Sequence, residues 1–180
     1  MMKRYLIAIL LFFCAYASGA VPVTIDGSTL LAYADKKLNP CGPLKNTSEG
    51  FVYLKVSEKY VDDLFPMLQD LLRASGSDDA DVLCKPPYVG DGKIGTHVSV
   101  IYVGELPKAI TSFPEKGRKV CFSVAGLAYV DPDQGPFQRV YYLRLISADL
   151  TKIRINYRLD PLYLGHDFHI TIGVVYKPDS

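Results

Sequence analysis

The sequence has little of several features from which the function of a chain is often read. Its 180 residues include only three histidines and four cysteines, and its charges nearly balance, with a formal net charge of +1. Such a chain lacks the basic surface on which general nucleic-acid binding depends. It also lacks a long alternation of strands and helices. An extended nucleic-acid-binding surface is therefore excluded, whereas a local site for one phosphate or a short oligonucleotide is not.

Only one stretch is apolar enough to resemble a membrane span. Lys3 and Arg4 precede the apolar run 5–16, and small residues follow it as far as Ala20. This pattern is typical of a secretory signal peptide, and the run is too short to span a bilayer comfortably. We therefore expect residues 1–20 to be a cleaved signal peptide and residues 21–180 to form one domain, secreted or periplasmic and without membrane attachment. The alternative is an uncleaved membrane anchor.

The few cysteines lack the paired spacing of a zinc site. Cys14 falls in the expected signal peptide, which leaves Cys41, Cys84 and Cys121. Export permits disulfides. Because Cys41 and Cys84 both lie beside prolines in loop-like segments, we expect a Cys41–Cys84 disulfide. Cys121 lies in an apolar run, which predicts a buried free thiol. A catalytic role for it is not expected, because no histidine is near it in sequence.

Hydrophobic patterning predicts a mixture of strands and helices. Runs rich in β-branched and aromatic residues predict strands at 51–57, 96–102, 119–130, 139–147 and 168–176. Apolar residues at helical spacing predict helices from Ser57 to about Ala74 and at 149–158. Residues 29–37 could form a short helix, although residues 21–50 show no clear periodicity. Pro66 either kinks the second helix or marks its true start. The strands at 119–130 and 139–147 flank a turn-forming segment and should pair as a hairpin.

Two of the predicted strands carry the same short motif. His97-Val98-Ser99 and His169-Ile170-Thr171 each place a histidine two residues before a hydroxyl side chain. Because side chains alternate along a strand, the histidine and the hydroxyl share one face. A strand-like run and a helical segment precede each motif, with the runs at 51–57 and 140–147. We interpret this repetition of strand, helix and His-x-Ser/Thr strand as an internal duplication.

This arrangement resembles the 2H phosphoesterase superfamily, which is named for two His-x-Ser/Thr motifs in two pseudo-symmetric lobes. With the runs upstream of each motif, the resemblance covers roughly residues 51 to 176 and indicates no subfamily. It implies an α+β fold in which two pseudo-symmetric lobes of antiparallel sheet, with flanking helices, surround a central cleft. It also implies that His97 and His169 are the catalytic acid and base, and that Ser99 and Thr171 bind the substrate phosphate.

These residue types suit the cleavage of a phosphodiester without a cofactor or a metal. One group must take a proton from the attacking oxygen and another must give one to the leaving oxygen, and an unperturbed histidine pKa near 6.5 suits both roles. Hydroxyl groups can donate to the non-bridging oxygens of the phosphate. We expect a monomer that acts on a nucleotide or short oligonucleotide, with a 2′,3′-cyclic phosphate, a 2′-5′ linkage or a terminal 3′-5′ linkage as the scissile group.

Other interpretations stay open at this point. The same scaffold could bind a nucleotide without cleaving it, and each motif histidine taken alone could be a hydrogen-bonded core residue. A secreted metal-dependent hydrolase could use His166 with His97 and His169, although no clustered Asp, Glu or Cys completes a ligand set; an exposed loop position is the other interpretation of His166. Lys85 and Lys93, in the glycine-rich segment before the first motif, are candidates for an additional phosphate-binding cation. Four tyrosines are candidates for stacking on a base: Tyr102, Tyr141, Tyr142 and Tyr176.

Overall fold

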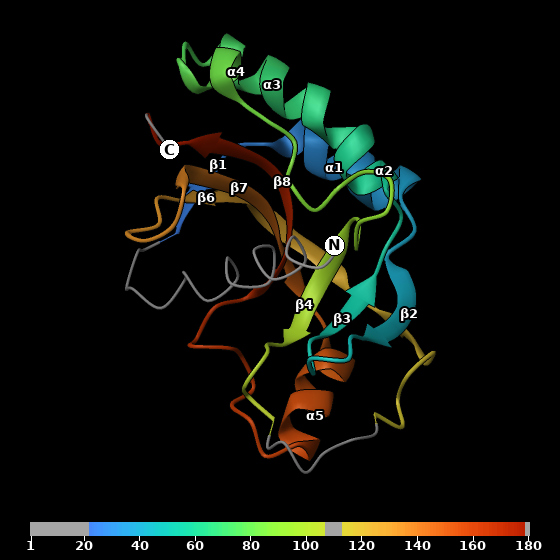
Figure 1. Cartoon of the computed structure of the whole chain (residues 1–180). Helices are drawn as coiled ribbons and strands as arrows, with labels where there is room; N and C mark the ends of the chain where they lie inside the picture. Colours follow the sequence, from blue (N-terminus) through green and yellow to red (C-terminus); the bar gives the residue numbers. More distant parts are fainter. Residues whose placement is uncertain (1–21, 107–112, 179–180) are drawn as a thin grey trace.

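Two antiparallel sheets form the framework of the protein, shown as a computed structural model in Figure 1. The structure describes residues 22–106 and 113–178. Sheet I has the strand order β1-β6-β7-β8, and sheet II has the order β5-β2-β3-β4. The strands of sheet I are β1 (Val23–Ile25), β6 (Ser123–Val130), β7 (Phe137–Ile146) and β8 (Phe168–Tyr176); those of sheet II are β2 (Cys41–Asn46), β3 (Val52–Lys55), β4 (His97–Ile101) and β5 (Lys119–Cys121). The predicted α+β class is confirmed at this level.

Among the described helices, those that connect two strands of the same sheet pack against the other sheet. The described helices are α1 (Ser28–Lys37), α2 (Lys59–Asp62), α3 (Leu64–Ala74), α4 (Asp79–Val82) and α5 (Ala148–Asn156). Helices α2, α3 and α4 connect β3 to β4 of sheet II, yet all three contact β8 of sheet I. Helix α5 connects β7 to β8 of sheet I, yet it contacts β4 and β5 of sheet II. Figure 1 shows α3 and α5 at opposite ends of the molecule. This exchange ties the two sheets into one body.

The helix predicted from Ser57 to Ala74 is interrupted after its first turn. Helix α2 ends at Asp62 and α3 begins at Leu64, which places Pro66 in the first turn of α3. Proline is tolerated there because the amide of a first-turn residue has no partner within the helix. Pro66 therefore belongs to the start of a helix and not to a kink within one. Three leucines on one face of α3 are fully or almost fully buried: Leu64, Leu68 and Leu72.

The predicted strand at 119–130 is two strands in different sheets. The chain leaves sheet II after β5, passes through Phe122, and enters sheet I as β6. The Phe122 amide donates a hydrogen bond to the Pro40 carbonyl, 3.0 Å away, and the Phe122 ring is buried. A continuous apolar run does not reveal this change of sheet, because both strands are half-buried. The predicted hairpin of β6 and β7 is confirmed by their antiparallel pairing.

The apolar side chains form a large core and a smaller separate cluster. The large core lies between the helices and the sheets, and its fully buried members include Leu44, Leu54, Leu127, Leu143 and Ile170. The smaller cluster consists of side chains from sheet I alone. Its buried members are Ala128, Val130, Val140, Tyr142 and Val174, with Phe137 packed against them. We refer to these six residues as the sheet I cluster.

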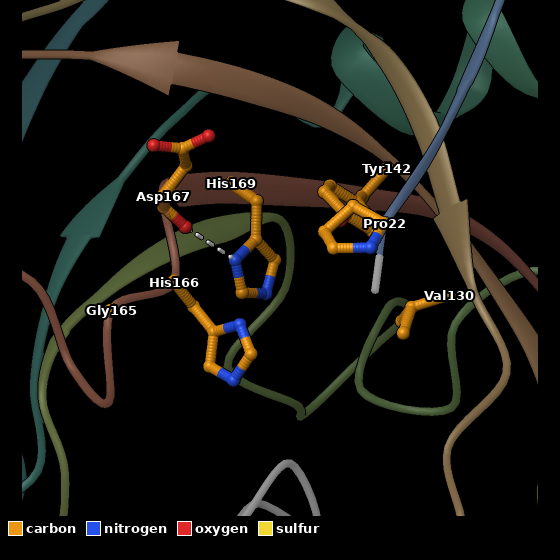
Figure 2. A pocket seen from close by; sticks show the side chains of 7 residues that line it. All are labelled: Pro22, Val130, Tyr142, Gly165, His166, Asp167 and His169. Carbon is orange, nitrogen blue, oxygen red and sulfur yellow. Dashed lines mark hydrogen bonds between the residues drawn. The ribbon is translucent and has the colours of Figure 1, made fainter. Parts of the chain in front are cut away.

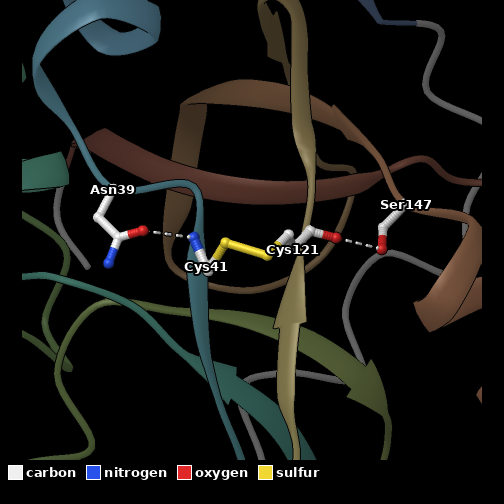
Figure 3. Close-up of a disulfide and its surroundings, with 4 residues drawn as sticks. All are labelled: Asn39, Cys41, Cys121 and Ser147. Atoms are coloured by element: carbon white, nitrogen blue, oxygen red, sulfur yellow. Dashed lines mark hydrogen bonds between the residues drawn. A yellow bond between two sulfur atoms is a disulfide. The ribbon is translucent and has the colours of Figure 1, made fainter.

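The disulfide joins Cys41 to Cys121, so the predicted Cys41–Cys84 bond is wrong (Figure 3). The antiparallel pairing of β2 with β5 places Cys41 directly opposite Cys121, with their Cα atoms 4.0 Å apart. Both are held by neighbours: the Cys41 amide donates to Asn39, and Ser147 donates to the Cys121 carbonyl. Cys84 instead lies beside Val174 of β8 and is exposed. The prediction of Cys121 as a buried free thiol is wrong for the same reason.

A disulfide fits a protein that folds in an oxidising compartment, as expected for an extracellular protein. Among residues 22–106 and 113–178, no helix is both long and apolar enough to cross a membrane. The predicted signal peptide, residues 1–20, lies outside the described residues. Its cleavage and the resulting export therefore stay predictions.

The disulfide assignment predicts a specific pattern of thiol reactivity. Peptide mapping without reduction should yield a Cys41–Cys121 pair, and of the three cysteines in the described residues only Cys84 should be alkylated in the folded protein. The double variant Cys41→Ser/Cys121→Ser should lose about 4 kcal/mol of unfolding free energy, because a loop with a sequence separation of 80 is no longer closed. Cys84→Ser is the matched control and should change stability by less than about 1 kcal/mol. Recovery of a peptide bridged through Cys84 would contradict the assignment.

Candidate active site

The two motif strands lie next to each other where the two sheets meet. Strand β4 is an edge of sheet II, strand β8 is an edge of sheet I, and the two contact each other. Figure 1 shows them side by side at the centre of the molecule. The four predicted site residues therefore come from two adjacent strands: His97 and Ser99 from β4, His169 and Thr171 from β8.

In sheet II the motif lies opposite two residues of β3. The antiparallel register pairs His97 with Lys55 and Ser99 with Tyr53. Directly opposite residues point to the same face of the sheet. The rings of Tyr53 and His97 meet edge to face, with centroids 5.6 Å apart. We call these four residues the sheet II quartet; it places an imidazole, a hydroxyl, a phenol and an ammonium group on one face.

In sheet I the same chemical groups recur in the same register. Arg144 of β7 lies opposite His169, and Tyr142 lies opposite Thr171. The centroids of the Tyr142 and His169 rings are 5.2 Å apart. We call these four residues the sheet I quartet. It differs from the sheet II quartet only in having arginine for lysine and threonine for serine.

A one-residue bulge follows the motif hydroxyl in each strand. The pairing of β3 with β4 shifts so that Val100, directly after Ser99, has no residue opposite it. The pairing of β7 with β8 shifts so that Ile172, directly after Thr171, has none. Bulges bend a strand and redirect the neighbouring side chains. The two strands thus share an irregularity as well as a motif.

Each motif histidine is held by the carbonyl of the residue two positions before it. His97 Nδ1 lies 2.7 Å from the Gly95 oxygen, and His169 Nδ1 lies 3.0 Å from the Asp167 oxygen, as Figure 2 shows for the second pair. A carbonyl can only accept, so Nδ1 must donate in both bonds. In the neutral rings this assigns the proton to Nδ1 and the lone pair to Nε2, the atom that can exchange a proton with a substrate.

In sheet II, an ion pair fixes the backbone before His97. Lys55 donates to the Ile94 carbonyl, 2.8 Å away, and is paired with Glu58. Glu58 in turn accepts from both the amide and the hydroxyl of Thr96, at 2.9 and 2.7 Å. Gly95 lies between these anchors with a φ of +75°, and a Cβ there would overlap the Lys55 and Glu58 side chains. The carbonyl that orients His97 is therefore fixed on both sides.

In sheet I, an ion pair holds the residue that orients His169. Arg144 Nε and a terminal nitrogen lie 2.8 and 2.7 Å from the Asp167 carboxylate. The Asp167 main chain supplies the carbonyl that binds His169 Nδ1. In both quartets, therefore, the cation opposite the histidine stabilises the segment that orients its ring. Such support fixes both the tautomer and the direction of an imidazole.

Lys55 and Arg144 were not predicted as site residues, although the sequence contains a signal for them. The runs before the two motifs contain Tyr53-Leu54-Lys55 and Tyr142-Leu143-Arg144, a repeat whose third residue is basic in both copies. The two cations that were predicted instead are engaged elsewhere. Lys85 pairs with Asp62 at 2.6 Å, and Lys93 donates to the Pro87 carbonyl at 2.6 Å.

Tyr88 links the two motifs. Its ring lies against that of His97, with centroids 4.6 Å apart, and its hydroxyl is hydrogen-bonded to Thr171. One tyrosine side chain thus spans from the motif of β4 to the motif of β8. The Tyr102 hydroxyl makes the corresponding contact with Ser99, and burial raises the pKa of both phenols.

Burial favours the neutral form of both motif histidines. It lowers the pKa of His97 to about 4, and repulsion from His169 and Lys55 lowers this pKa further. The hydrogen bond to the Gly95 carbonyl opposes the decrease. Burial also lowers the pKa of His169, opposed by the hydrogen bond to the Asp167 carbonyl and by the Asp167 charge. The charge of His169 contributes to the lowered pKa of His97. The two rings are therefore close enough to interact electrostatically.

A pocket of about 100 Å³ opens beside His169 (Figure 2). Its lining residues are Pro22, Val130, Tyr142, Gly165, His166, Asp167 and His169. His166 is half-buried in this lining, so its predicted exposed loop position is only partly correct. Within the described part of the chain, no group of three or more His, Cys, Asp or Glu side chains is placed to hold a metal ion.

Comparison of the chain with protein-family models, curated proteins and solved structures finds no match. Its chemistry must therefore be inferred from the site. The structure brings the four predicted site residues together on neighbouring strands and adds Lys55, Arg144 and Tyr88 to their surroundings.

The lowered pKa of His97 predicts how stability depends on pH. An imidazole in the unfolded chain titrates near 6.5, whereas folded His97 titrates at about 4. Between these values the unfolded chain binds more protons, so the contribution of His97 is complete above about pH 6.5 and decreases as the pH falls toward 4. The decrease should reach roughly 3 kcal/mol. Urea unfolding at pH 7 and pH 4.5 should therefore show a smaller loss for His97→Gln than for wild type, and an equal loss in both would contradict the assignment.

Proposed function

We propose that this protein is an exported, metal-independent phosphodiesterase of the 2H phosphoesterase type, which cleaves a nucleotide or RNA-end linkage between His97 and His169. The observation that carries the proposal is that the same set of four residues, with the same register and the same bulge, occurs once on β3 and β4 and once on β7 and β8. The two motif strands, β4 and β8, contact each other. Chance repetition of a tripeptide would not reproduce the opposite residues, the carbonyl contact and the bulge together.

An approximate two-fold relation between two lobes is part of the proposal. Both sheets have the order of an outer strand, a hairpin pair and a motif strand. In both, the helical segment lies between the hairpin and the motif strand in sequence. Such a relation would place the quartets on opposite walls of one cleft, with a phosphate between them. Each histidine would then approach a different oxygen of the same phosphorus.

The proposed reaction is a proton relay across one phosphate. One neutral imidazole takes a proton through Nε2 from the attacking oxygen, and the other, protonated, gives one to the leaving oxygen. Ser99 and Thr171 turn from their tyrosine partners and donate to the non-bridging oxygens, which gain charge in the transition state. The Nδ1 bonds to Gly95 and Asp167 support this assignment, since they keep Nε2 as the reacting atom of both rings.

A nucleotide-binding protein without turnover is the second candidate, and one observation favours it. The motif hydroxyls bind Tyr102 and Tyr88, and His97 is only 3% exposed. A substrate must displace these contacts before a phosphate can reach both motifs. If it displaces only part of them, a nucleotide would bind but not react.

A substrate panel in the presence of a chelator tests the proposal. The panel contains a 2′,3′-cyclic nucleotide, a 2′-5′ dinucleotide and a 3′-5′ oligonucleotide, and products are identified by mass. Wild type should cleave at least one, and His97→Ala and His169→Ala should each lower kcat by about 10²–10⁴. Ser99→Ala and Thr171→Ala should lower it by roughly 10–10³.

The matched control is Ile155→Ala, which shortens a side chain of α5 that is 52% exposed. It should leave kcat within about twofold, because surface changes outside a site have small effects. Full activity in either histidine variant would refute the two-histidine mechanism. Binding of a panel member without product would favour the second candidate instead.

A further inference from the structure

The two histidines have different surroundings despite their equivalent positions. His97 is enclosed by three aromatic rings, with centroid distances of 5.7 Å to Phe51, 5.6 Å to Tyr53 and 4.6 Å to Tyr88. The Tyr142 ring lies against His169, with centroids 5.2 Å apart. His169 instead forms part of the wall of the pocket. The two ends of the proposed phosphate site therefore differ in the room that they leave for a substrate.

The pocket beside His169 has one wall of imidazoles and another of apolar groups. Figure 2 shows the rings of His166 and His169 on one side, and Pro22, Tyr142 and Val130 on the other. Val130 and Tyr142 are members of the sheet I cluster, so the apolar wall continues into a buried surface. The Asp167 carboxylate points away from the pocket, toward its partner Arg144. The walls of the pocket are thus flat or apolar, and the edges of the His166 and His169 rings supply polar atoms on one side.

These features favour one class of ligand group. A flat, weakly polar ring can stack on imidazole and phenol rings, as nucleobases do on aromatic side chains. At about 100 Å³, the pocket is smaller than the roughly 300–1,000 Å³ that encloses a whole small-molecule ligand. It therefore suits one ring of a substrate whose remainder lies at the phosphate site.

We propose that this pocket binds the base of the departing nucleoside, so that His169 is the general acid and His97 the general base. This inference rests on the proposed phosphodiesterase activity. In the step, His97 Nε2 takes the proton of the attacking hydroxyl or water as its oxygen bonds to phosphorus. The bond from phosphorus to the nucleoside oxygen breaks, and that oxygen receives the proton of His169 Nε2. Both electron pairs and both protons are accounted for without a further reactant.

The electrostatic surroundings of the two histidines also differ. Burial is the main cause that lowers the pKa of both rings; Lys55 acts with it and Glu58 against it at His97, whereas His166 acts with it and Asp167 against it at His169. The pKa of His97 is lowered to about 4. An imidazole that stays neutral can accept a proton, and one beside a carboxylate can retain a proton in the presence of the anionic phosphate.

A sulfur leaving group tests the assignment of the acid. A dinucleotide with a bridging phosphorothiolate releases a thiolate, which needs no proton from the enzyme. For the oxygen substrate both His97→Ala and His169→Ala should be slower than wild type by about 10²–10⁴. For the sulfur substrate His169→Ala should recover to within about tenfold of wild type, whereas His97→Ala should not. Recovery of His97→Ala, or of neither variant, would overturn the assignment and leave the phosphodiesterase activity intact.

Filling the pocket tests the nucleoside site. Val130→Phe should raise KM at least tenfold for a substrate with a departing nucleoside, and change KM less than twofold for the matched substrate with an abasic ribose there. Pro22→Trp fills the same pocket from an exposed position and should act alike if Val130→Phe does not fold. Val82→Phe is the control, since Val82 is 56% exposed on α4. Equal effects on both substrates would contradict a base in this pocket.

Failure of the pocket assignment can be distinguished from failure of the proposed function. If wild type cleaves no substrate in the panel, the proposed function fails, and calorimetry with a nucleoside monophosphate then tests the pocket alone. Binding by wild type and by Val82→Phe, but at least tenfold weaker binding by Val130→Phe and Pro22→Trp, would support a nucleoside site without turnover. No binding by wild type would overturn the pocket assignment as well.

Discussion

The contact between β4 and β8 is the interaction on which the remaining architecture depends. Each is an edge strand, and an edge must be covered if it is not to pair with another chain. Here each edge lies against the other, and the helices that connect two strands of one sheet pack on the opposite sheet. The contact can therefore form only when both halves of the chain have folded.

A buried ion pair between Arg154 and Glu105 supports β4, one of the two strands in this contact. Arg154 of α5 is 1% exposed and pairs with Glu105, at 2.7 Å. It also donates to the Val100 carbonyl at the bulge of β4 and to the Asp160 carbonyl, both at 2.7 Å. A buried guanidinium is tolerated when such bonds satisfy it, and loss of its partner typically costs about 3–5 kcal/mol. Glu105 further accepts from the Tyr102 amide, so the pair supports the residue that contacts Ser99.

Much of the fold could be predicted because its strands have strong patterns, whereas contacts between distant segments could not. Alternating β-branched residues gave the correct bounds of β8. The pairing of Cys41 with Cys121 depends on the register of β2 with β5, which no local pattern encodes. The two motifs identified the candidate histidines, but their partners Lys55 and Arg144 needed the register of a neighbouring strand. Tyr88 was hidden in a loop, because only the folded chain brings it across to Thr171.

The central claim is that His97 and His169 act on one phosphate, and NMR titration of the two imidazoles tests it most directly. Their pKa values would be measured with and without inorganic phosphate, with signals assigned from the His97→Ala and His169→Ala spectra. Because one anion between both rings stabilises the charged form of each, both pKa values should rise together and saturate at the same phosphate concentration. A rise at one histidine alone, or at neither, would contradict a shared phosphate site.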